Sequence, residues 1–484
     1  MATPPIILGM SPLVPAALFG WVPAVAVLFV LLPPRRAVLA AFLLAWLFLP
    51  VVHEPVLGLR WTKMRATCYG VLLAAAVFDS ARLQAFRLRA WDAPLLLWCV
   101  CPFASSLSNG LGLYDACSQT LDQTVTWGLP YLIGRLYFAD LRGLRDLSVG
   151  IIAGGLAYAP LCLIEIRFSP QLHTWVYGYF QHSFAQTIRF GGYRPVVFLD
   201  HGLAVGMWMT AASMLALWLW WSRTLPALRP WPGGRPLPMR WVVPALWAVT
   251  FLCKSSGALG LGIAGSAVLL LTARTGLRAL ALAMALAAPW YVWARTWGGW
   301  SGLEFAEFLG GSFDRERAAS LIFRLENENL LIGRALESPV FGWGGWGRAR
   351  VYDLDGNDLT VTDGLWVIAL GDRGLVGLAG LMGTLLAPAA AVLIRLPGRL
   401  WSRPAFAPAA ALAVLGAANA IDCLANAMFN PVFVMAAGAV TGAFAAGLPR
   451  DPTRRARAGA PAPAPPARSF RRKYPARRGA ALSP

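Results

Sequence analysis

Charged residues are scarce in this chain. Of its 484 residues only 13% are Asp, Glu, Lys or Arg, and 57% are hydrophobic, whereas soluble domains carry roughly 25% charged residues. The mean hydropathy is +0.57. These values exclude one large soluble core and indicate a polytopic membrane protein. Many of the 22 Trp residues stand near the ends of apolar runs, where they would anchor helices at the membrane interface.

Metal and redox motifs are lacking as well. Most of the seven Cys lie inside apolar runs, where Cys behaves as a small hydrophobic residue. None has the spacing of a zinc or redox motif. The run DLDGND at 353–358 resembles a calcium-binding loop, but its Gly is at the fourth position rather than the sixth. We therefore expect no metal ion and no cofactor.

Apolar runs of the length of a membrane span follow one another along the chain. A helix needs about 20 apolar residues to cross the bilayer, so we expect an all-α integral membrane protein with about twelve to thirteen transmembrane helices. The start lacks the short basic region of a cleavable signal peptide, so the first run is expected to stay as a span. The expected spans are 12–32, 37–53, 62–79, 91–107, 119–137, 145–165, 196–220, 241–254, 257–273, 278–297, 366–393, 405–424 and 428–447. The runs beside Lys254 and Asn430 are candidates for broken helices.

The arrangement of basic residues predicts the orientation. One set of alternate loops is basic in every member, and cytoplasmic loops collect Arg and Lys. We therefore place this set and the C-terminus in the cytoplasm, and the N-terminus outside, as in a bacterial inner-membrane protein. The other side receives 108–118, 166–195 and one large extracytoplasmic loop at 298–365. The short basic segment 54–65 runs against this assignment.

The chain divides into a membrane domain, 1–447, and a basic tail, 448–484. The tail is rich in Ala, Pro and Arg and has too little apolar surface to fold, so we predict a disordered cytoplasmic arm that lies on anionic lipid. The formal net charge of +19 includes this tail. Because cytoplasmic segments account for the excess of Arg and Lys, no nucleic-acid partner is predicted.

The long polar insert at 298–364 must stand in water on one side of the membrane. Residues 321–337 have the pattern of an amphipathic helix, on which Arg324 and Glu328 are four apart and would pair. A glycine-rich run, FGWGGWG, follows at 341–347. Its glycines either admit a ligand or make turns.

Asp363 closes the insert, just before the next span begins. One interpretation makes it a general base that accepts a proton from a hydroxyl group. The other makes it the N-cap of the following helix. Farther on, Asp372 and Arg373 are adjacent inside the apolar run, where a charge is expensive unless it is paired.

A second external loop ends in RFGGYRP at 189–195. Arg189 and Arg194 stand there at the mouth of a span, and the planar fork of an arginine suits phosphate. They would form a diphosphate clamp, or else extend to lipid headgroups. His201 follows inside the apolar run, where an ionisable side chain indicates either a functional role or a structural hydrogen bond.

Four runs, taken in order, resemble motifs of the O-antigen ligase and O-antigen polymerase superfamily of bacterial envelope glycosyltransferases. They are RFGGYRP at 189–195, SSGALGLG at 255–262, the set Arg324, Pro339, Gly342 and Gly344, and Asp363 followed by GDRGLVGL. The resemblance covers roughly 185–385, and elsewhere only the topology is similar. Ligases usually have His at the position of Asp363, which favours a polymerase or a ligase-like relative here.

This resemblance implies a glycosyltransferase that acts at the outer face of the inner membrane. The implied donor is an undecaprenyl-diphosphate-linked glycan, and the implied acceptor is a hydroxyl group of another glycan or of a lipid-linked sugar, with no metal. The implied catalytic residues are Asp363 and Arg324. The implied substrate-binding residues are Arg189, Arg194, His201, Gly342 and Gly344.

A transporter or flippase of a lipid-linked glycan is the alternative. Such a protein is expected to have charged or broken helices at matching midplane positions of two halves. Here the polar residues cluster at the outer side and in one large loop, which favours the enzyme. Convergence of Arg189, Arg194, Arg324 and Asp363 on one outward-facing cavity would support transfer, and scatter along a through-going path would support transport.

Overall fold

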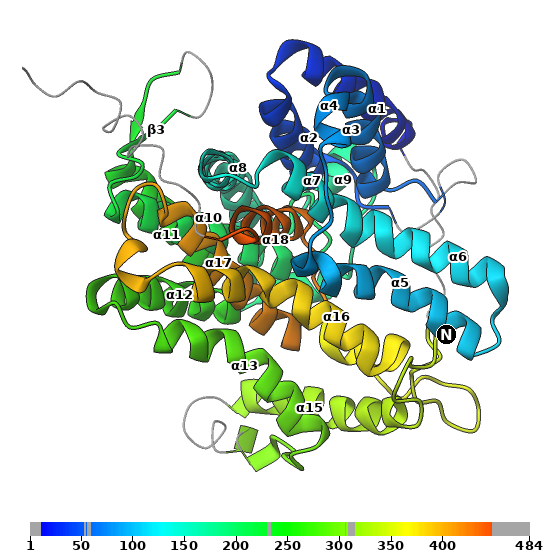
Figure 1. Ribbon diagram of the computed structural model, residues 1–484. Helices are drawn as coiled ribbons and strands as arrows, with labels where there is room; N and C mark the ends of the chain where they lie inside the picture. Colours follow the sequence, from blue (N-terminus) through cyan, green and yellow to red (C-terminus); the bar gives the residue numbers. More distant parts are fainter. Residues whose placement is uncertain are drawn as a thin grey trace, which may run out of the picture. The chain divides into compact units, whose positions relative to one another are not determined.

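The computed structural model describes residues 11–52, 55, 60–229, 234–304, 306–307 and 315–447, with the backbone alone at 315–320. The predicted disordered tail, 448–484, lies outside the described residues. The fold is all-α, as predicted (Figure 1). Two short antiparallel ribbons interrupt it, β1 (Ile188–Arg189) with β2 (Gly192–Tyr193), and β3 (Ala227–Leu228) with β4 (Leu237–Pro238).

A helix lies at each of the thirteen expected spans. In chain order these helices are α1 (Leu13–Leu31), α2 (Pro34–Phe48), α3 (Lys63–Phe78), α5 (Ala93–Ser108), α6 (Gly112–Gln123) continued by α7 (Leu129–Tyr137), α8 (Leu141–Phe168), α10 (Gly202–Trp221), α11 (Met239–Leu252), α12 (Ser256–Thr275), α13 (Ala279–Thr296), α16 (Leu365–Arg395), α17 (Ala407–Ala425) and α18 (Pro431–Phe444). The shorter helices include α4 (Ser80–Gln84) and α9 (Leu172–Tyr177).

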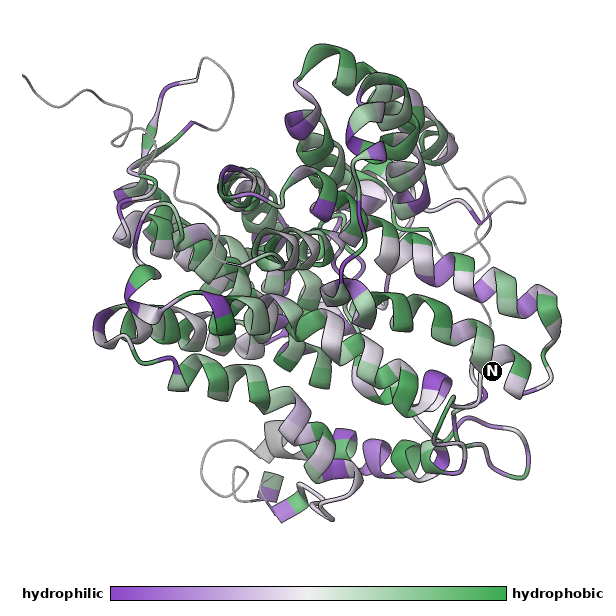
Figure 2. Cartoon of the chain, viewed as in Figure 1, coloured by the Kyte–Doolittle hydropathy of each residue, from purple (hydrophilic) through white to green (hydrophobic). Residues whose placement is uncertain are grey.

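Seven helical segments in the described part of the chain are long and apolar enough to cross a membrane. They are α1, α5 with the turn before it, α8, α10, α12, α16 and α17. The expected twelve to thirteen spans exceed this number partly because α2, α3, α11 and α18 have only 14 to 16 residues each. Figure 2 shows the apolar character along these helices, with polar residues gathered at connections and on the insert.

Both expected helix breaks are present. Between α11 and α12 the chain turns at Lys254, whose φ is +53°. Between α17 and α18 it runs non-helically, and the Asn430 side chain accepts hydrogen bonds from the backbone N–H groups of Val432 and Phe433 at the start of α18. Each break therefore separates two helices by a short non-helical stretch.

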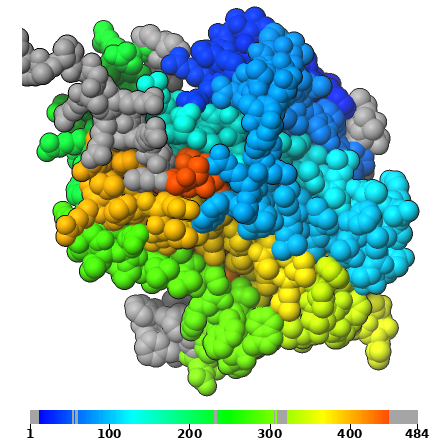
Figure 3. All heavy atoms as spheres, in the orientation of Figure 1, coloured from blue at the N-terminus to red at the C-terminus, as the bar shows by residue number. Residues whose placement is uncertain are grey.

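The amphipathic helix of the insert is α15 (Arg315–Leu336), close to the predicted 321–337. After it, the glycine-rich run packs into a break inside α16, where Gly374 has φ +63° and ψ −165°. The backbone N–H groups of Trp343 and Gly344 donate hydrogen bonds to the carbonyls of Gly371 (2.8 Å) and Asp372 (3.1 Å). Figure 3 shows this part of the insert beside α5, α6 and α16.

We expect the substitution Gly342→Ala to destabilise the protein. Gly342 has φ +67°, and a Cβ atom there would lie 2.5 Å from the backbone nitrogen of Arg373. The positive φ alone costs a non-glycine residue about 1–3 kcal/mol, and the backbone contact adds to that. Thermal unfolding in detergent should show a lower midpoint. Gly333→Ala is the control, because nothing lies near its Cβ position on α15, and its midpoint should not fall. Equal midpoints for both variants would contradict this close packing.

Candidate functional site

The first part of the site is the segment between α9 and α10, which carries Arg189 and Arg194. The Nζ atom of Lys254 donates hydrogen bonds to the carbonyls of Arg189 (2.9 Å) and Phe190 (3.3 Å), which holds the β1–β2 hairpin. The Arg194 side chain is buried, and its Nη2 donates to the carbonyl of Lys254 at 3.1 Å. A Cβ atom at Gly202 would come within 2.3 Å of Arg194 Cδ. The absence of a side chain at Gly202 therefore makes room for Arg194 at the start of α10.

The irregular backbone after Arg194 is buried and held from α8. The Glu165 carboxylate accepts hydrogen bonds from the backbone N–H groups of Val196 (2.8 Å) and Val197 (2.7 Å). Gln181 donates to the carbonyl of Val197 at 3.0 Å. Val197 has φ +53°, which is strained for a β-branched residue. Such strain persists where the surroundings over-determine it, so these contacts fix the position from which Arg194 extends.

The second part of the site is α15, which a buried ion pair fixes to α13. Arg295 Nε lies 3.2 Å from Glu328 Oε2, and the Tyr291 hydroxyl donates to the same oxygen at 2.7 Å. The predicted pairing of Arg324 with Glu328 along one helix is therefore wrong. Glu328 faces α13, and burial raises its pKa above the ordinary value.

Arg324 instead pairs with Asp363, which brings the two predicted catalytic residues together. Arg324 Nε lies 3.2 Å from Asp363 Oδ2, and both side chains are partly exposed. Asn327 supports this arrangement, because its Oδ1 accepts a hydrogen bond from the backbone N–H of Val361 at 2.8 Å. The alternative interpretation of Asp363 as a helix N-cap is wrong, since the N-cap of α16 is Gly364 and no side chain caps that helix.

The sequence interpretation missed a second acid, Asp422, near the end of α17. Asp422 is buried, accepts a hydrogen bond from Asn426 Nδ2 at 2.8 Å, and lies close enough to Arg324 for the two charges to attract. The backbone carbonyl of Asn426 in turn accepts a hydrogen bond from the backbone N–H of Leu365, two residues after Asp363. The signal was present, because Asp422 is an ionisable residue within the expected span 405–424.

The positive charges of Arg189, Arg194 and Arg324 repel one another, although Arg324 comes from a loop far along the chain from the other two. Burial first, and then the charges of Arg189 and Arg324, lower the pKa of Arg194 to about 10. The Nε atom of Arg194 is buried and has no hydrogen-bond partner among the described residues. An unpaired buried donor costs about 1–3 kcal/mol, and more when it is charged. The three arginines together therefore favour binding of an anion that offers several oxygen acceptors.

His201 lies in the same region and is held neutral by its contacts. Its Nδ1 accepts a hydrogen bond from the backbone N–H of Leu203 at 3.0 Å, so its Nε2 carries the proton and donates to Gln186 Oε1 at 3.0 Å. Its ring lies 4.6 Å from that of His182, centroid to centroid. Burial, His182 and the arginines lower the pKa of His201 to about 3.

We expect His201 to make folding sensitive to acid. The unfolded chain binds a proton at His201 near pH 6.5, whereas the folded chain does so only near pH 3. The unfolded state therefore binds more protons in this window, and stability falls as the pH falls through it. His173, with a pKa lowered to about 4 mainly by burial, acts in the same sense.

The substitution His201→Asn removes this titration and keeps a side chain that caps helices well. Unfolding midpoints at about pH 7.5 and about pH 5 should differ less in this variant than in the parent protein, although His173 keeps part of the difference. The same difference in both proteins would show that His201 is not held neutral by the fold.

Gly342 and Gly344 are not part of the arginine cluster. Both have positive φ, and both lie against the break in α16 and the end of α5. Both glycines therefore allow the backbone to pack closely. The sequence had left two roles open for them, turns and ligand binding. Their role in binding substrate stays a prediction.

No group of three or more His, Cys, Asp or Glu is placed to hold a metal ion among the described residues. In the run at 353–358, the Asp353 carboxylate accepts hydrogen bonds from the backbone of Asp355 and Asn357, as in an Asx turn. Comparison with protein-family models and with curated proteins finds no match to the chain. The interpretation of the site therefore depends on its residues and their geometry.

Proposed function

We propose that the protein is a membrane glycosyltransferase that moves an undecaprenyl-diphosphate-linked glycan onto a sugar hydroxyl, similar to O-antigen polymerases and ligases. One observation carries the proposal. Arg189 and Arg194 from one loop and Arg324 from the insert act on one shared region, and Arg324 pairs there with Asp363. A cationic group beside a carboxylate matches a reaction in which an anionic group leaves and a hydroxyl attacks.

In the proposed reaction the acceptor hydroxyl oxygen attacks the anomeric carbon of the donor glycan. The bond from that carbon to the phosphate oxygen breaks, and undecaprenyl diphosphate leaves with the bonding electrons. Arg194 and Arg324 stabilise the negative charge that develops on the diphosphate. The hydroxyl proton passes to a carboxylate, for which Asp363 and the neighbouring Asp422 are the candidates.

The position of the insert supports a lipid-borne donor. Trp290, Trp293 and Trp297, at the end of α13, are each more than half exposed. Trp residues are enriched at the interface between membrane and water, so these three would place the start of the insert at the membrane surface. α15, which the Arg295–Glu328 ion pair joins to the end of α13, carries Arg324. An enzyme whose donor keeps its polyprenyl chain in the bilayer needs its cationic group at this depth.

Transport of a lipid-linked glycan receives less support. The 188–201 segment contacts Lys254, and the charge of Arg324 in the insert acts on Arg194, so these polar residues belong to connections between helices. A transporter is expected instead to have its polar residues on discontinuous helices near the midplane of two repeated halves.

The test of the proposed function uses the purified full chain with a lipid-linked glycan donor. Longer glycans should appear, with one undecaprenyl diphosphate released for each glycosidic bond formed, without added nucleotide sugar or divalent cation. Deletion of the gene should leave shortened surface polysaccharide and accumulated lipid-linked intermediates. Movement of the lipid-linked glycan across the vesicle membrane, without cleavage of the bond between glycan and diphosphate, would favour transport instead.

A further inference from the structure

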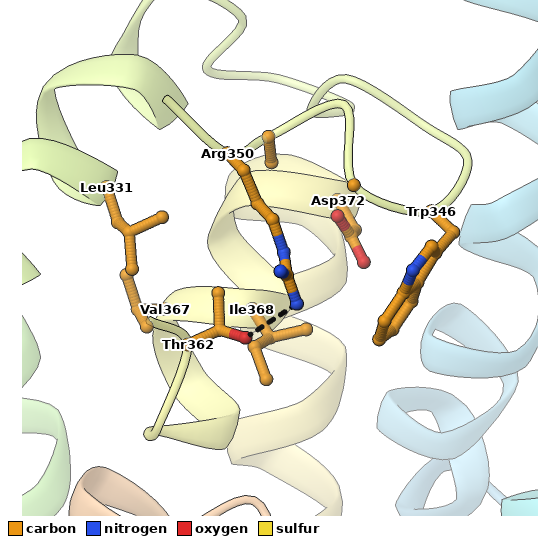
Figure 4. Close-up of a pocket in the computed structure, with 9 residues that line it drawn as sticks. Leu331, Trp346, Arg350, Thr362, Val367, Ile368 and Asp372 are labelled. Carbon is orange, nitrogen blue, oxygen red and sulfur yellow. Dashed lines mark hydrogen bonds between the residues drawn. The ribbon is translucent and has the colours of Figure 1, made fainter. Parts of the chain in front are cut away.

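A small pocket lies between α15, the loop after the glycine-rich run and the first turns of α16 (Figure 4). Its free volume is about 30 Å³, and its walls include Leu331, Trp346, Arg350, Thr362 and Asp372. This volume has room for one hydroxyl-sized group rather than for a sugar ring. The ring of any sugar bound here therefore remains at the mouth of the pocket.

An aromatic ring stands at that mouth. The Trp346 side chain is 82% exposed, and the Arg350 guanidinium carbon lies 5.3 Å from its ring centroid. Trp346 belongs to the glycine-rich run, whose backbone is fixed against α16. An exposed indole on a fixed backbone offers a flat apolar surface that loses little freedom on binding. The C–H face of a pyranose carries slight positive charge and packs on the negative face of such a ring.

Three polar side chains, Arg350, Thr362 and Asp372, line the pocket among apolar ones, and Arg350 pairs with Asp358. Figure 4 shows the Asp372 carboxylate between Arg350 and Trp346. Within the part of the chain that the structure describes, no hydrogen bond or ion pair to this carboxylate is found, although the charges of Arg373 and Arg350 attract it. Arg350 also donates to the Thr362 hydroxyl at 3.4 Å, a long contact that a ligand oxygen can replace. Carboxylate, guanidinium and hydroxyl together accept from and donate to vicinal hydroxyl groups.

We infer that this pocket is a subsite for the acceptor glycan, in which a pyranose stacks on Trp346 and one of its hydroxyl groups reaches Asp372. The inference rests on the glycosyl transfer proposed above and adds where the acceptor binds. Leu331 lies seven residues after Arg324 on α15, about 10 Å along the helix axis and on the same face. Thr362 directly precedes Asp363. A glycan held here can therefore extend along α15 toward the Arg324–Asp363 pair.

The test measures binding without turnover. The probe is a set of short oligosaccharides released by mild acid from the surface polysaccharide of the source strain, added to the purified full chain. Saturation-transfer NMR and titration should detect binding to the parent protein. Trp346→Ala should weaken it about tenfold, since an aromatic stacking contact contributes about 0.5–1.5 kcal/mol beyond its buried area. Asp372→Asn, which keeps the shape of the side chain, should weaken it about fivefold through loss of a charged hydrogen bond.

Trp346→Phe should retain most of the binding, and Trp175→Ala, at another exposed Trp on α9, should retain all of it. Equal affinities for the parent protein, Trp346→Ala and Asp372→Asn would overturn the subsite, whether or not the protein transfers glycan. Loss of binding in these two variants would support the acceptor subsite even if no transfer were detected. In that case only the proposed function would be contradicted. The two failures are therefore distinguishable.

Discussion

Arg194→Ala should lower the rate of glycan transfer from a purified lipid-linked donor by about 100-fold or more. The side chain is buried, its Nε has no hydrogen-bond partner among the described residues, and two further arginines act on it. Removing a preorganised donor that faces developing charge typically costs about 2.7–4 kcal/mol in the transition state. Arg189 is exposed, so Arg189→Ala should have a smaller effect.

Arg194→Lys should restore only part of the activity. Lysine keeps the positive charge but lacks the planar fork that binds two oxygens at once. Arg167→Ala is the matched control, because Arg167 is an exposed base at the end of α8 and should not affect transfer. Size-exclusion profiles and unfolding midpoints report whether each variant is folded. A folded Arg194→Ala protein with the parent rate would show that this arginine binds no diphosphate.

Asp363→Asn should lower the transfer rate by about 100-fold or more if Asp363 accepts the hydroxyl proton. The structure removes the N-cap alternative and introduces another, in which Asp363 only positions Arg324. Asn keeps the shape and can still accept a hydrogen bond from Arg324, whereas it cannot act as a base. Asp363→Ser removes both functions and should be no more active than Asp363→Asn.

A double-mutant cycle with Arg324 separates the two roles. If Asp363 only positions Arg324, the pair Arg324→Ala and Asp363→Asn should be no slower than Arg324→Ala alone. If Asp363 is the base, the two losses should multiply, and the dependence of rate on pH should change in Asp363→Asn. Transfer near the parent rate in Asp363→Asn would exclude it as the base. Asp422→Asn would then be the next variant to measure, because Glu328 is occupied by Arg295 and Tyr291.

The sequence by itself determined the helices and where along the chain the candidate site residues stand. Long apolar runs predict helices because a backbone in an apolar surrounding must satisfy its own hydrogen bonds. Each expected span has its helix, both breaks are where Lys254 and Asn430 indicated, and α15 has the predicted amphipathic pattern. The sequence also predicted the polar insert at 298–364 between two apolar runs. Seven helices in the described part of the chain have the length and composition of a full span, fewer than the expected spans, because hydropathy alone does not show where a helix ends.

Only the tertiary structure decided which side chains meet. Sequence spacing favoured the pairing of Arg324 with Glu328, since residues four apart share a helix face. Because α15 packs against α13, Glu328 pairs with Arg295 instead, and Arg324 pairs with Asp363. Asp422 comes to the same place through the end of α17. The periodicity of the sequence predicts which residues share a helix face but not which residues that face contacts. Contacts between residues far apart in the chain depend on how the helices pack.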